Sequence, residues 1–231
     1  MSGPLVSCIV PVFNGERYLG KTLDSILAQT YRPIEILIVD DGSTDKSPEV
    51  ASSYREVARY LRQANAGQAT ARNLGVNVSR GKFVAFLDAD DLWHPEKLTR
   101  LLARFAVKLE LDYCLTHVQN FWEAELAQEA EMYQGHPRGQ PLPGYVTGTL
   151  VAKRSLLERI GLFDTSLGHT DKTEWFLRAD AAGAVKELLP DVLMYRRMHA
   201  GNRSRALAAK SRDEYLRLLK TTLDRRRSEA G

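Results

Sequence analysis

The sequence has few cysteines, no long apolar run and little net charge, and each shortage excludes a class of protein. Two cysteines in 231 residues are too few for a scaffold held by disulfides. Both Cys8 and Cys114 fall in apolar stretches, so we expect buried thiols in a reducing cytoplasm. No apolar run reaches the roughly 18 residues of a membrane-spanning helix. The N-terminus has no basic segment and no small-residue cleavage site, so we expect no signal peptide.

The net charge of +3 is concentrated near the C-terminus. Residues 205–231 hold 8 Lys/Arg and 4 Asp/Glu, whereas residues 1–204 hold 24 and 25. The body therefore lacks the basic stripe that is typical of nucleic-acid binders, and we expect no nucleic-acid partner. Apolar residues make up 44% and charged residues 26% of the chain, as in ordinary globular domains, which argues against disorder.

The N-terminal half alternates short apolar runs with amphipathic patterns. Residues 6–13, 34–39 and 82–87 are apolar and rich in β-branched side chains, as expected of strands buried on both faces. Apolar residues recur at helical spacing over 19–27 and 98–105. This alternation predicts an α/β fold with a mostly parallel sheet flanked by helices.

The second half is less regular. Residues 111–118, 146–152 and 188–195 are candidate strands, and 172–182 is a candidate helix. Residues 133–144 contain three Pro and three Gly, which predicts a loop. A loop of this length inside a compact domain is more often functional than idle.

Acidic residues follow two of the buried strands directly, as Asp40-Asp41-Gly42-Ser43 and as Asp88-Ala89-Asp90-Asp91. In open parallel sheets, ligands bind outside the carboxyl ends of the strands. Five carboxylates there would repel a phosphate unless a divalent cation lies between, and carboxylates suit Mg²⁺ and Mn²⁺. The pattern therefore predicts a diphosphate held through a metal, with other carboxylates binding hydroxyls. The alternative is that the first acidic segment is only a turn and a helix cap.

A second pattern offers a competing interpretation. Residues 15–22 fit the phosphate-binding loop G-x-x-x-x-G-K-[ST] and follow a strand. Such a loop wraps a phosphate with backbone N–H groups and favours small residues, whereas Arg17, Tyr18 and Leu19 are bulky. Leu19 is also in helical register with Leu23. A P-loop NTPase is therefore the weaker alternative.

Several motifs together resemble family 2 glycosyltransferases. In the first half they are Val10-Pro11-Val12-Phe13-Asn14, Ser25-Ile26-Leu27-Ala28-Gln29-Thr30-Tyr31, Asp40-Asp41-Gly42-Ser43-Thr44-Asp45, Asn65-Ala66-Gly67, Ala71-Arg72-Asn73-Leu74-Gly75 and Phe86-Leu87-Asp88-Ala89-Asp90-Asp91. In the second half they are residues 154–164, residues 175–178, and residues 195–199 with Asn202 and Ser204. The resemblance runs from about residue 5 to residue 204. It implies a GT-A fold and an inverting transfer from a nucleotide-diphosphate sugar, usually a UDP-sugar.

The resemblance also implies roles for individual residues. The residues that it places at the nucleotide are Pro11, Val12, Phe13, Asn14, Asp40, Asp41, Gln68, Arg72, Asp88 and Ala89. Within this set Asp41 would contact the base and Asp88 the ribose. Asp90 would bind the Mn²⁺ or Mg²⁺ that bridges the diphosphate, and His199 would add a metal or phosphate contact.

The segment that should carry the general base departs from the family pattern. The family usually has Glu-Asp six or seven residues before the Arg that matches Arg178, and the second acid takes the proton of the acceptor hydroxyl. Here that position falls on Lys172, and a lysine at its ordinary pKa is protonated at neutral pH. Three alternatives stay open. Asp171 is the base after a one-residue shift, Glu174 replaces it, or the chain binds a nucleotide sugar with little or no transfer.

The same resemblance gives a domain organisation and a set of partners. Residues 1–204 would form one GT-A domain, with a nucleotide-binding half over about 1–110 and an acceptor half over about 111–204. Residues 205–231 would form a basic helix that packs on the domain or a second subunit, or lies peripherally on an anionic membrane. We expect a UDP-sugar donor, a carbohydrate or lipid-linked acceptor, and a cytoplasmic location that includes the inner membrane face.

Overall fold

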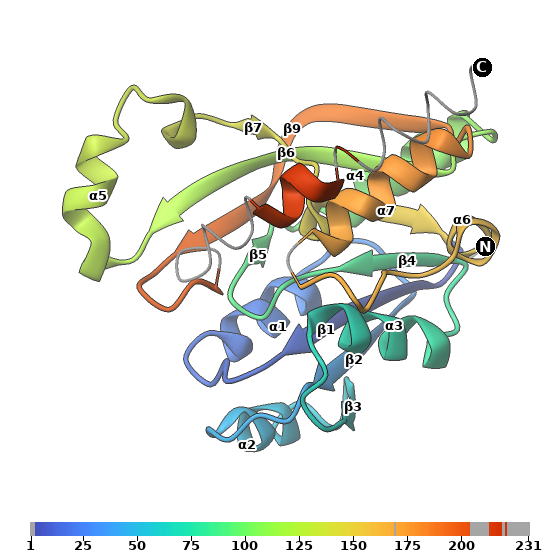
Figure 1. Ribbon diagram of the computed structural model, residues 1–231. Helices are drawn as coiled ribbons and strands as arrows, with labels where there is room; N and C mark the ends of the chain where they lie inside the picture. Colours follow the sequence, from blue (N-terminus) through green and yellow to red (C-terminus); the bar gives the residue numbers. More distant parts are fainter. Residues whose placement is uncertain (1–2, 169, 204–212, 219, 221–231) are drawn as a thin grey trace.

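The computed structural model describes residues 3–168, 170–203, 213–218 and 220, and it places one continuous sheet through both halves of the chain (Figure 1). The strands are β1 (Val6–Val12), β2 (Ile34–Asp40), β3 (Arg59–Arg62), β4 (Phe83–Phe86), β5 (Leu92–Trp93), β6 (Tyr113–Trp122), β7 (Leu142–Pro143), β8 (Val151–Lys153) and β9 (Lys186–Met198). The helices are α1 (Leu19–Leu27), α2 (Ser47–Ser52), α3 (Gln68–Val78), α4 (Lys97–Val107), α5 (Ala127–Met132), α6 (Arg154–Ile160) and α7 (Asp171–Ala181). The prediction of an α/β fold with a mostly parallel sheet between helices is confirmed.

The N-terminal half forms the parallel part of the sheet, whose full strand order is β3-β2-β1-β4-β8-β6-β9-β5. Strand β1 pairs in parallel with β2 and β4, and β2 pairs in parallel with β3. The chain leaves β1 toward β2 and β3 and then returns to the other side of β1 as β4. The connections after β1 and β4 therefore run in opposite directions, which leaves a crevice at the carboxyl ends of these strands.

The C-terminal half adds antiparallel neighbours and a projecting arm. Strand β8 is antiparallel to β4 and β6, whereas β6 and β9 run parallel. The ends of β6 and β9 extend beyond the rest of the sheet and, with α5, form the arm at the left of Figure 1. The predicted loop at 133–144 is confirmed as mostly irregular, with a 3₁₀ turn at Pro137–Gly139 and the short β7.

Alternate residues of the central strand β1 enter two hydrophobic cores. Cys8 and Val10 pack in the core that holds buried residues of α1, α2 and α4. Ile9 packs in the opposite core, with residues of α3, α6 and α7. Cys8 and Cys114 are both free and buried, as predicted, and burial raises the pKa of each thiol to about 12.

Most of the basic helix that we predict over residues 205–231 lies outside the described residues. Residues 213–218 are helical and are drawn in red beside α7 (Figure 1). Here the Thr170 hydroxyl donates a hydrogen bond of 3.0 Å to Glu214 Oε1, next to the start of α7. No described helix has the length and apolarity needed to cross a membrane.

Candidate active site

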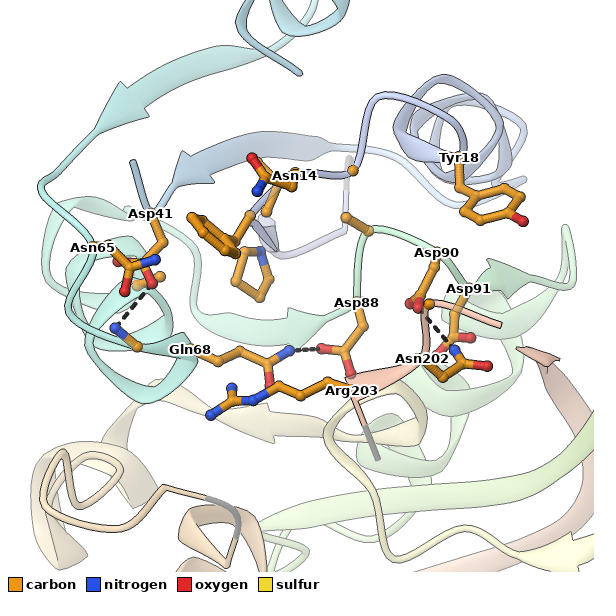
Figure 2. Close-up of a pocket in the computed structure, with 18 of the residues that line it drawn as sticks. Asn14, Tyr18, Asp41, Asn65, Gln68, Asp88, Asp90, Asp91, Asn202 and Arg203 are labelled. Atoms are coloured by element: carbon orange, nitrogen blue, oxygen red, sulfur yellow. Dashed lines mark hydrogen bonds between the residues drawn. The ribbon is translucent and has the colours of Figure 1, made fainter. Parts of the chain in front are cut away.

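A cavity of about 700 Å³ lies at the carboxyl ends of β1, β2 and β4 (Figure 2). Its walls come from the loops after these strands, from the beginnings of α3 and α7, and from the end of β9 with the segment that follows. The sequence-predicted site residues that line it are Pro11, Val12, Phe13, Asn14, Asp41, Gln68, Asp88, Ala89, Asp90, Asp171 and His199. The fold thus brings most of the predicted site together, including residues about 190 positions apart in the chain.

The loop after β1 contains a residue with positive backbone φ. Asn14 has φ 51°, in a region that Asn adopts more readily than most side chains. The backbone N–H of Asn14 donates to Ser43 Oγ at 2.9 Å. Its side-chain Oδ1 accepts from the backbone N–H of Thr44 at 2.8 Å. These bonds tie the loop after β1 to the loop after β2. Phe13 lines the cavity and is 51% exposed, so it offers an apolar ring face to a planar ligand.

The two acids after β2 shape the wall beside this loop. Asp40 is fully buried and accepts hydrogen bonds from the Ser43 amide at 2.8 Å and the Tyr60 hydroxyl at 2.6 Å. Asp41 accepts from the backbone amides of residues 66–67 at 2.8 and 2.9 Å. Of the two, Asp41 lines the cavity and Asp40 does not, so Asp40 supports the wall from behind although the resemblance places it at the nucleotide.

Asp88 is the centre of a network that links the two halves of the chain. Its Oδ1 accepts from Gln68 Nε2 at 2.8 Å, the bond drawn in Figure 2, and from Arg72 Nη2 at 3.0 Å. Arg72 Nη1 also donates to Asp171 Oδ2 at 2.8 Å, at the start of α7. The Arg72 side chain is 0% exposed and does not line the cavity. The resemblance places Arg72 at the nucleotide, and the geometry puts it behind the cavity wall, where it holds Asp88 and Asp171.

The charges in this network keep Asp88 ionised. Burial opposes ionisation, but the positive charges of Arg72 and Lys172 outweigh it and lower the pKa of the Asp88 carboxyl. Asp88 is therefore a carboxylate at neutral pH, and its side chain is 31% exposed. A carboxylate of this kind can accept hydrogen bonds from ligand hydroxyls.

Asp90 lies between the loop after β4 and the segment after β9. Its Oδ2 is 3.0 Å from His199 Nε2 and accepts from Asn202 Nδ2 at 3.2 Å (Figure 2). Within the described residues, the hydrogen bonds of the Asp90 carboxylate all reach Oδ2, and the side chain is 32% exposed. The ring of His199 packs against that of Tyr18, with 4.7 Å between centroids. Asp90 thus keeps one oxygen open to the cavity.

The donor set fits a cation that takes most of its ligands from a substrate. In the described part of the chain, no three His, Cys, Asp or Glu side chains are grouped as a metal centre. Mg²⁺ and similar cations are commonly held by one or two carboxylates together with substrate phosphates and water. Asp90 supplies an open carboxylate oxygen for that arrangement, and His199 lies beside it.

Asp91 is part of the support beneath this site. Its Oδ1 accepts from the Arg197 amide at 2.9 Å. Burial, and then the charge of Asp90, raise the pKa of the Asp91 carboxyl well above its ordinary value. The Arg197 guanidinium donates to the Asp90 carbonyl at 2.8 Å and pairs with Glu123. These contacts fix the end of β9 against the loop after β4.

The structure separates the two candidate bases. Asp171 lines the cavity, but its side chain is only 6% exposed and Oδ2 is held by Arg72. Glu174 does not line the cavity, and Arg178 holds its two oxygens at 2.8 and 2.7 Å. Lys172 lines the cavity beside Asp171, and burial, followed by the charge of Arg72, lowers the pKa of its amine.

The residues that match a P-loop pattern do not form a phosphate cradle. Helix α1 begins within the pattern, at Leu19. Thr22 is buried, and its hydroxyl donates to the Asp91 carbonyl at 2.9 Å. Lys21 is exposed and does not line the cavity. The segment is a helix start that supports the acidic loop.

Sequence reasoning missed several lining residues, among them Tyr18, Asn65, Arg196, Asn202 and Arg203. Asn65 and Asn202 belong to motifs that mark the family resemblance, and Arg196 lies within one, so those motifs could have identified them. Tyr18 carried no such signal, because it reads as the apolar start of a helix. Arg203 lies in a polar segment with no periodicity.

The fold and the cavity define a class of protein, an α/β protein whose acid-lined site at the switch point of a parallel sheet is suited to a nucleotide. The sequence model described as "Glycosyl transferase family 2" matches residues 7–162. The chain belongs to this family.

A curated relative agrees with this assignment. The chain is 35% identical over 184 residues to an uncharacterized glycosyltransferase of Rickettsia prowazekii (strain Madrid E). The match covers 75% of this chain and 58% of the relative, so the chain spans less than two thirds of that protein.

Solved structures confirm the GT-A fold. S. aureus TarS in complex with UDP-GlcNAc matches with a TM-score of 0.71 at 22% identity, over 89% of this chain and 61% of that chain. The mannosyltransferase PcManGT from Pyrobaculum calidifontis, in complex with GDP-Man and Mn²⁺, matches with a TM-score of 0.67 at 22% identity. That match covers 89% of this chain and 62% of the mannosyltransferase chain.

Proposed function

We propose that this protein transfers a sugar from a nucleotide-diphosphate sugar to an acceptor, with inversion and with the help of a divalent metal. The observation that carries the proposal is the placement of Asp88 and Asp90, each a partly exposed acid, at the switch point of the sheet in a family 2 chain. TarS was solved with UDP-GlcNAc and PcManGT with GDP-Man and Mn²⁺, which supports a donor of this chemical class. Because the family resemblance favours uridine, a UDP-sugar is the donor that we propose.

The cavity suggests how such a donor would be held. The base would lie between the exposed ring of Phe13 and the wall that Asp41 shapes. The ribose hydroxyls would reach the Asp88 carboxylate, and the diphosphate would lie toward Asp90. A divalent cation at Asp90, with His199 beside it, would stabilise the charge that grows on the leaving nucleoside diphosphate.

The second candidate function is binding of a nucleotide sugar with little or no transfer. The observation that favours it is the cation Lys172 at the expected base position, together with the pairing of Asp171 to Arg72. The two functions differ in turnover and not in affinity for the donor. Release of the nucleoside diphosphate therefore separates them.

The experiment is an assay of nucleoside diphosphate release from a panel of UDP-sugars and GDP-mannose, with Mn²⁺ and with a chelator. We expect release from one UDP-sugar, loss of release with the chelator, and a drop of about 100-fold or more in Asp90→Asn, the scale of a lost transition-state contact. Lys21→Ala is the matched control, because Lys21 is exposed outside the cavity.

Each other outcome of this assay is informative. Donor binding without release in any condition would favour the binding protein. Release that ignores the chelator and Asp90→Asn would contradict the metal assignment. Loss of nucleotide binding in Lys21→Ala would restore the P-loop alternative.

We also propose a carbohydrate or lipid-linked acceptor and a cytoplasmic protein that contacts the inner membrane face through residues 205–231. The basic composition of that segment supports the proposal. Each Lys or Arg near an anionic membrane contributes about 1 kcal/mol. Replacing Arg225, Arg226 and Arg227 with Gln should weaken co-sedimentation with phosphatidylserine vesicles about 100-fold. Equal binding of the wild type and this variant to the vesicles would refute the membrane contact.

A further inference from the structure

Cationic side chains line the cavity on the side that the second half of the chain builds. Lys172 lies at the start of α7, Arg196 lies near the end of β9, and Arg203 follows β9. The Arg203 guanidinium donates to the Gly168 carbonyl at 2.8 Å, and Figure 2 draws this side chain among those that line the cavity. The cavity therefore has an acidic wall after β4 and a basic wall on the acceptor side.

Lys172 has no ion-pair partner among the described residues. The carboxylates whose charge favours its ammonium form are those of Asp88 and Asp171, and Arg72 already binds both. Burial and the Arg72 guanidinium both disfavour the ammonium form of Lys172. A ligand anion beside Lys172 would supply the compensation that the protein itself lacks.

Among the described residues of this wall, neither candidate base has a freely exposed carboxylate. Asp171 is nearly buried with one oxygen held by Arg72, and Glu174 is held by Arg178 outside the cavity. A hydroxyl acceptor needs a base to take its proton. A phosphate monoester or a carboxylate is already deprotonated at neutral pH, so it needs none.

We propose that the acceptor nucleophile is an oxyanion, a phosphate monoester or a carboxylate, and that Lys172 binds it at the position where the family usually has its base. This inference rests on the proposed function, because it needs an activated sugar in the cavity. In the transfer step, the anionic oxygen forms a bond to the anomeric carbon. The bond from that carbon to the diphosphate oxygen breaks, and its electron pair leaves with the nucleoside diphosphate. No proton is transferred.

The cationic side chains of this wall could instead bind the diphosphate of the donor. The test must therefore separate binding of an acceptor anion from binding of the donor diphosphate. Lys172 lies in the first turn of α7, whereas Asp90 lies in the loop after β4, so the two residues belong to different walls of the cavity. Saturation of the protein with UDP and Mn²⁺ fills the donor site before an acceptor anion is added.

The experiment titrates methyl phosphate and acetate into the full chain saturated with UDP and Mn²⁺. We expect Lys172→Gln to weaken anion binding at least tenfold, Lys172→Arg to stay within about threefold, and the exposed control Lys21→Gln to be unchanged. Tighter binding of methyl phosphate assigns a phosphate acceptor, and tighter binding of acetate assigns a carboxylate. Methyl phosphate, but not methanol, should also accelerate UDP release from the UDP-sugar that is turned over.

Three results would overturn the inference. The first is equal anion affinity in the wild type and Lys172→Gln at saturating UDP. The second is weaker UDP binding in Lys172→Gln with unchanged anion binding, which would assign the cation to the donor. The third is acceleration by methanol that equals that by methyl phosphate. Lys172→Met serves as a second variant if Lys172→Gln does not fold. Failure of the wild type to bind UDP would instead refute the proposed function itself.

Discussion

At the scale of single residues, the molecule depends on charges that are buried and paired. Arg72 is fully buried and holds Asp88 and Asp171, so one guanidinium serves both the donor wall and the start of α7. Removing one member of a buried ion pair leaves an uncompensated charge, which is far more costly than losing an exposed pair. The sequence placed Arg72 in the site through a family motif, but only its burial shows that it acts from behind the wall.

Arg72→Gln should lower the free energy of unfolding by about 3–5 kcal/mol, because the buried Asp171 and the partly exposed Asp88 lose a fully buried cation. Arg80→Gln is the matched control, because Arg80 is 79% exposed in its pair with Glu35. This substitution should lower the free energy of unfolding by less than about 1 kcal/mol. Urea unfolding of the three proteins measures the difference. Similar small costs for both variants would refute the supporting role of Arg72.

Lys97 is a second buried charge, with an effect that depends on pH. Its side chain is 0% exposed, its Nζ has no hydrogen-bond partner within the described residues, and burial lowers its pKa from 10.5 to about 7. Between these pH values the unfolded chain binds a proton that the folded chain lacks. Burial of the Lys97 ammonium lowers the free energy of unfolding, and this cost is fully present below about pH 7. The cost falls as pH increases from about 7 to 10.5, so stability rises over that range.

Lys97→Met should accordingly be more stable than the wild type by a few kcal/mol at about pH 6, since one pKa unit corresponds to about 1.4 kcal/mol. The advantage should shrink toward about pH 10. Urea unfolding at both pH values tests this, with the exposed Lys82→Met as control. An advantage that does not change with pH would contradict the burial argument.

At the scale of elements, strong apolar patterns were predictable and short or small-residue elements were not. The strands β1, β2 and β4 and the helices α1 and α4 were predicted to within a residue or two, because their apolar residues are numerous and periodic. Strand β3 has only four residues, two of them exposed, so it left no apolar signal. Helix α3 buries mainly small residues such as Ala69 and Ala71, so it left no strong apolar pattern and was not predicted.

The small residues of α3 permit a close approach to β1, which a glycine substitution tests. A Cβ at Gly75 would lie 2.4 Å from Ile9 Cγ2, whereas a Cβ at Gly20 in α1 would meet only the Tyr54 hydroxyl at 3.4 Å. Gly75→Ala should destabilise the fold by about 1–3 kcal/mol through overpacking. Gly20→Ala should stabilise it by about 0.5–1 kcal/mol through reduced backbone freedom in the unfolded chain. Thermal unfolding of both variants checks the opposite signs, and a neutral Gly75→Ala would contradict the packing.

At the scale of the whole molecule, one sheet joins the two halves of the chain that line the cavity. The grouping of the acids was predictable, because acids that follow neighbouring parallel strands must meet at one edge of the sheet. The surroundings of the two candidate bases were predictable only in part. Glu174 and Arg178 form an i,i+4 pair within one helix, which helical spacing indicates. The pairing of Arg72 with Asp171 depends on how α3 packs against α7, which no local pattern encodes.

We propose that the acids after β4 hold a nucleoside diphosphate, with Asp88 at the ribose and Asp90 at a divalent metal. Calorimetric titration of UDP and of ATP, each with and without Mn²⁺, tests it most directly, with Asp90→Asn alongside the wild type. We expect tight binding of UDP only with Mn²⁺, a loss of at least about tenfold in affinity in Asp90→Asn, and weak binding of ATP. UDP affinity that is indifferent to Mn²⁺ and to Asp90→Asn, or binding of ATP as tight as that of UDP, would contradict it.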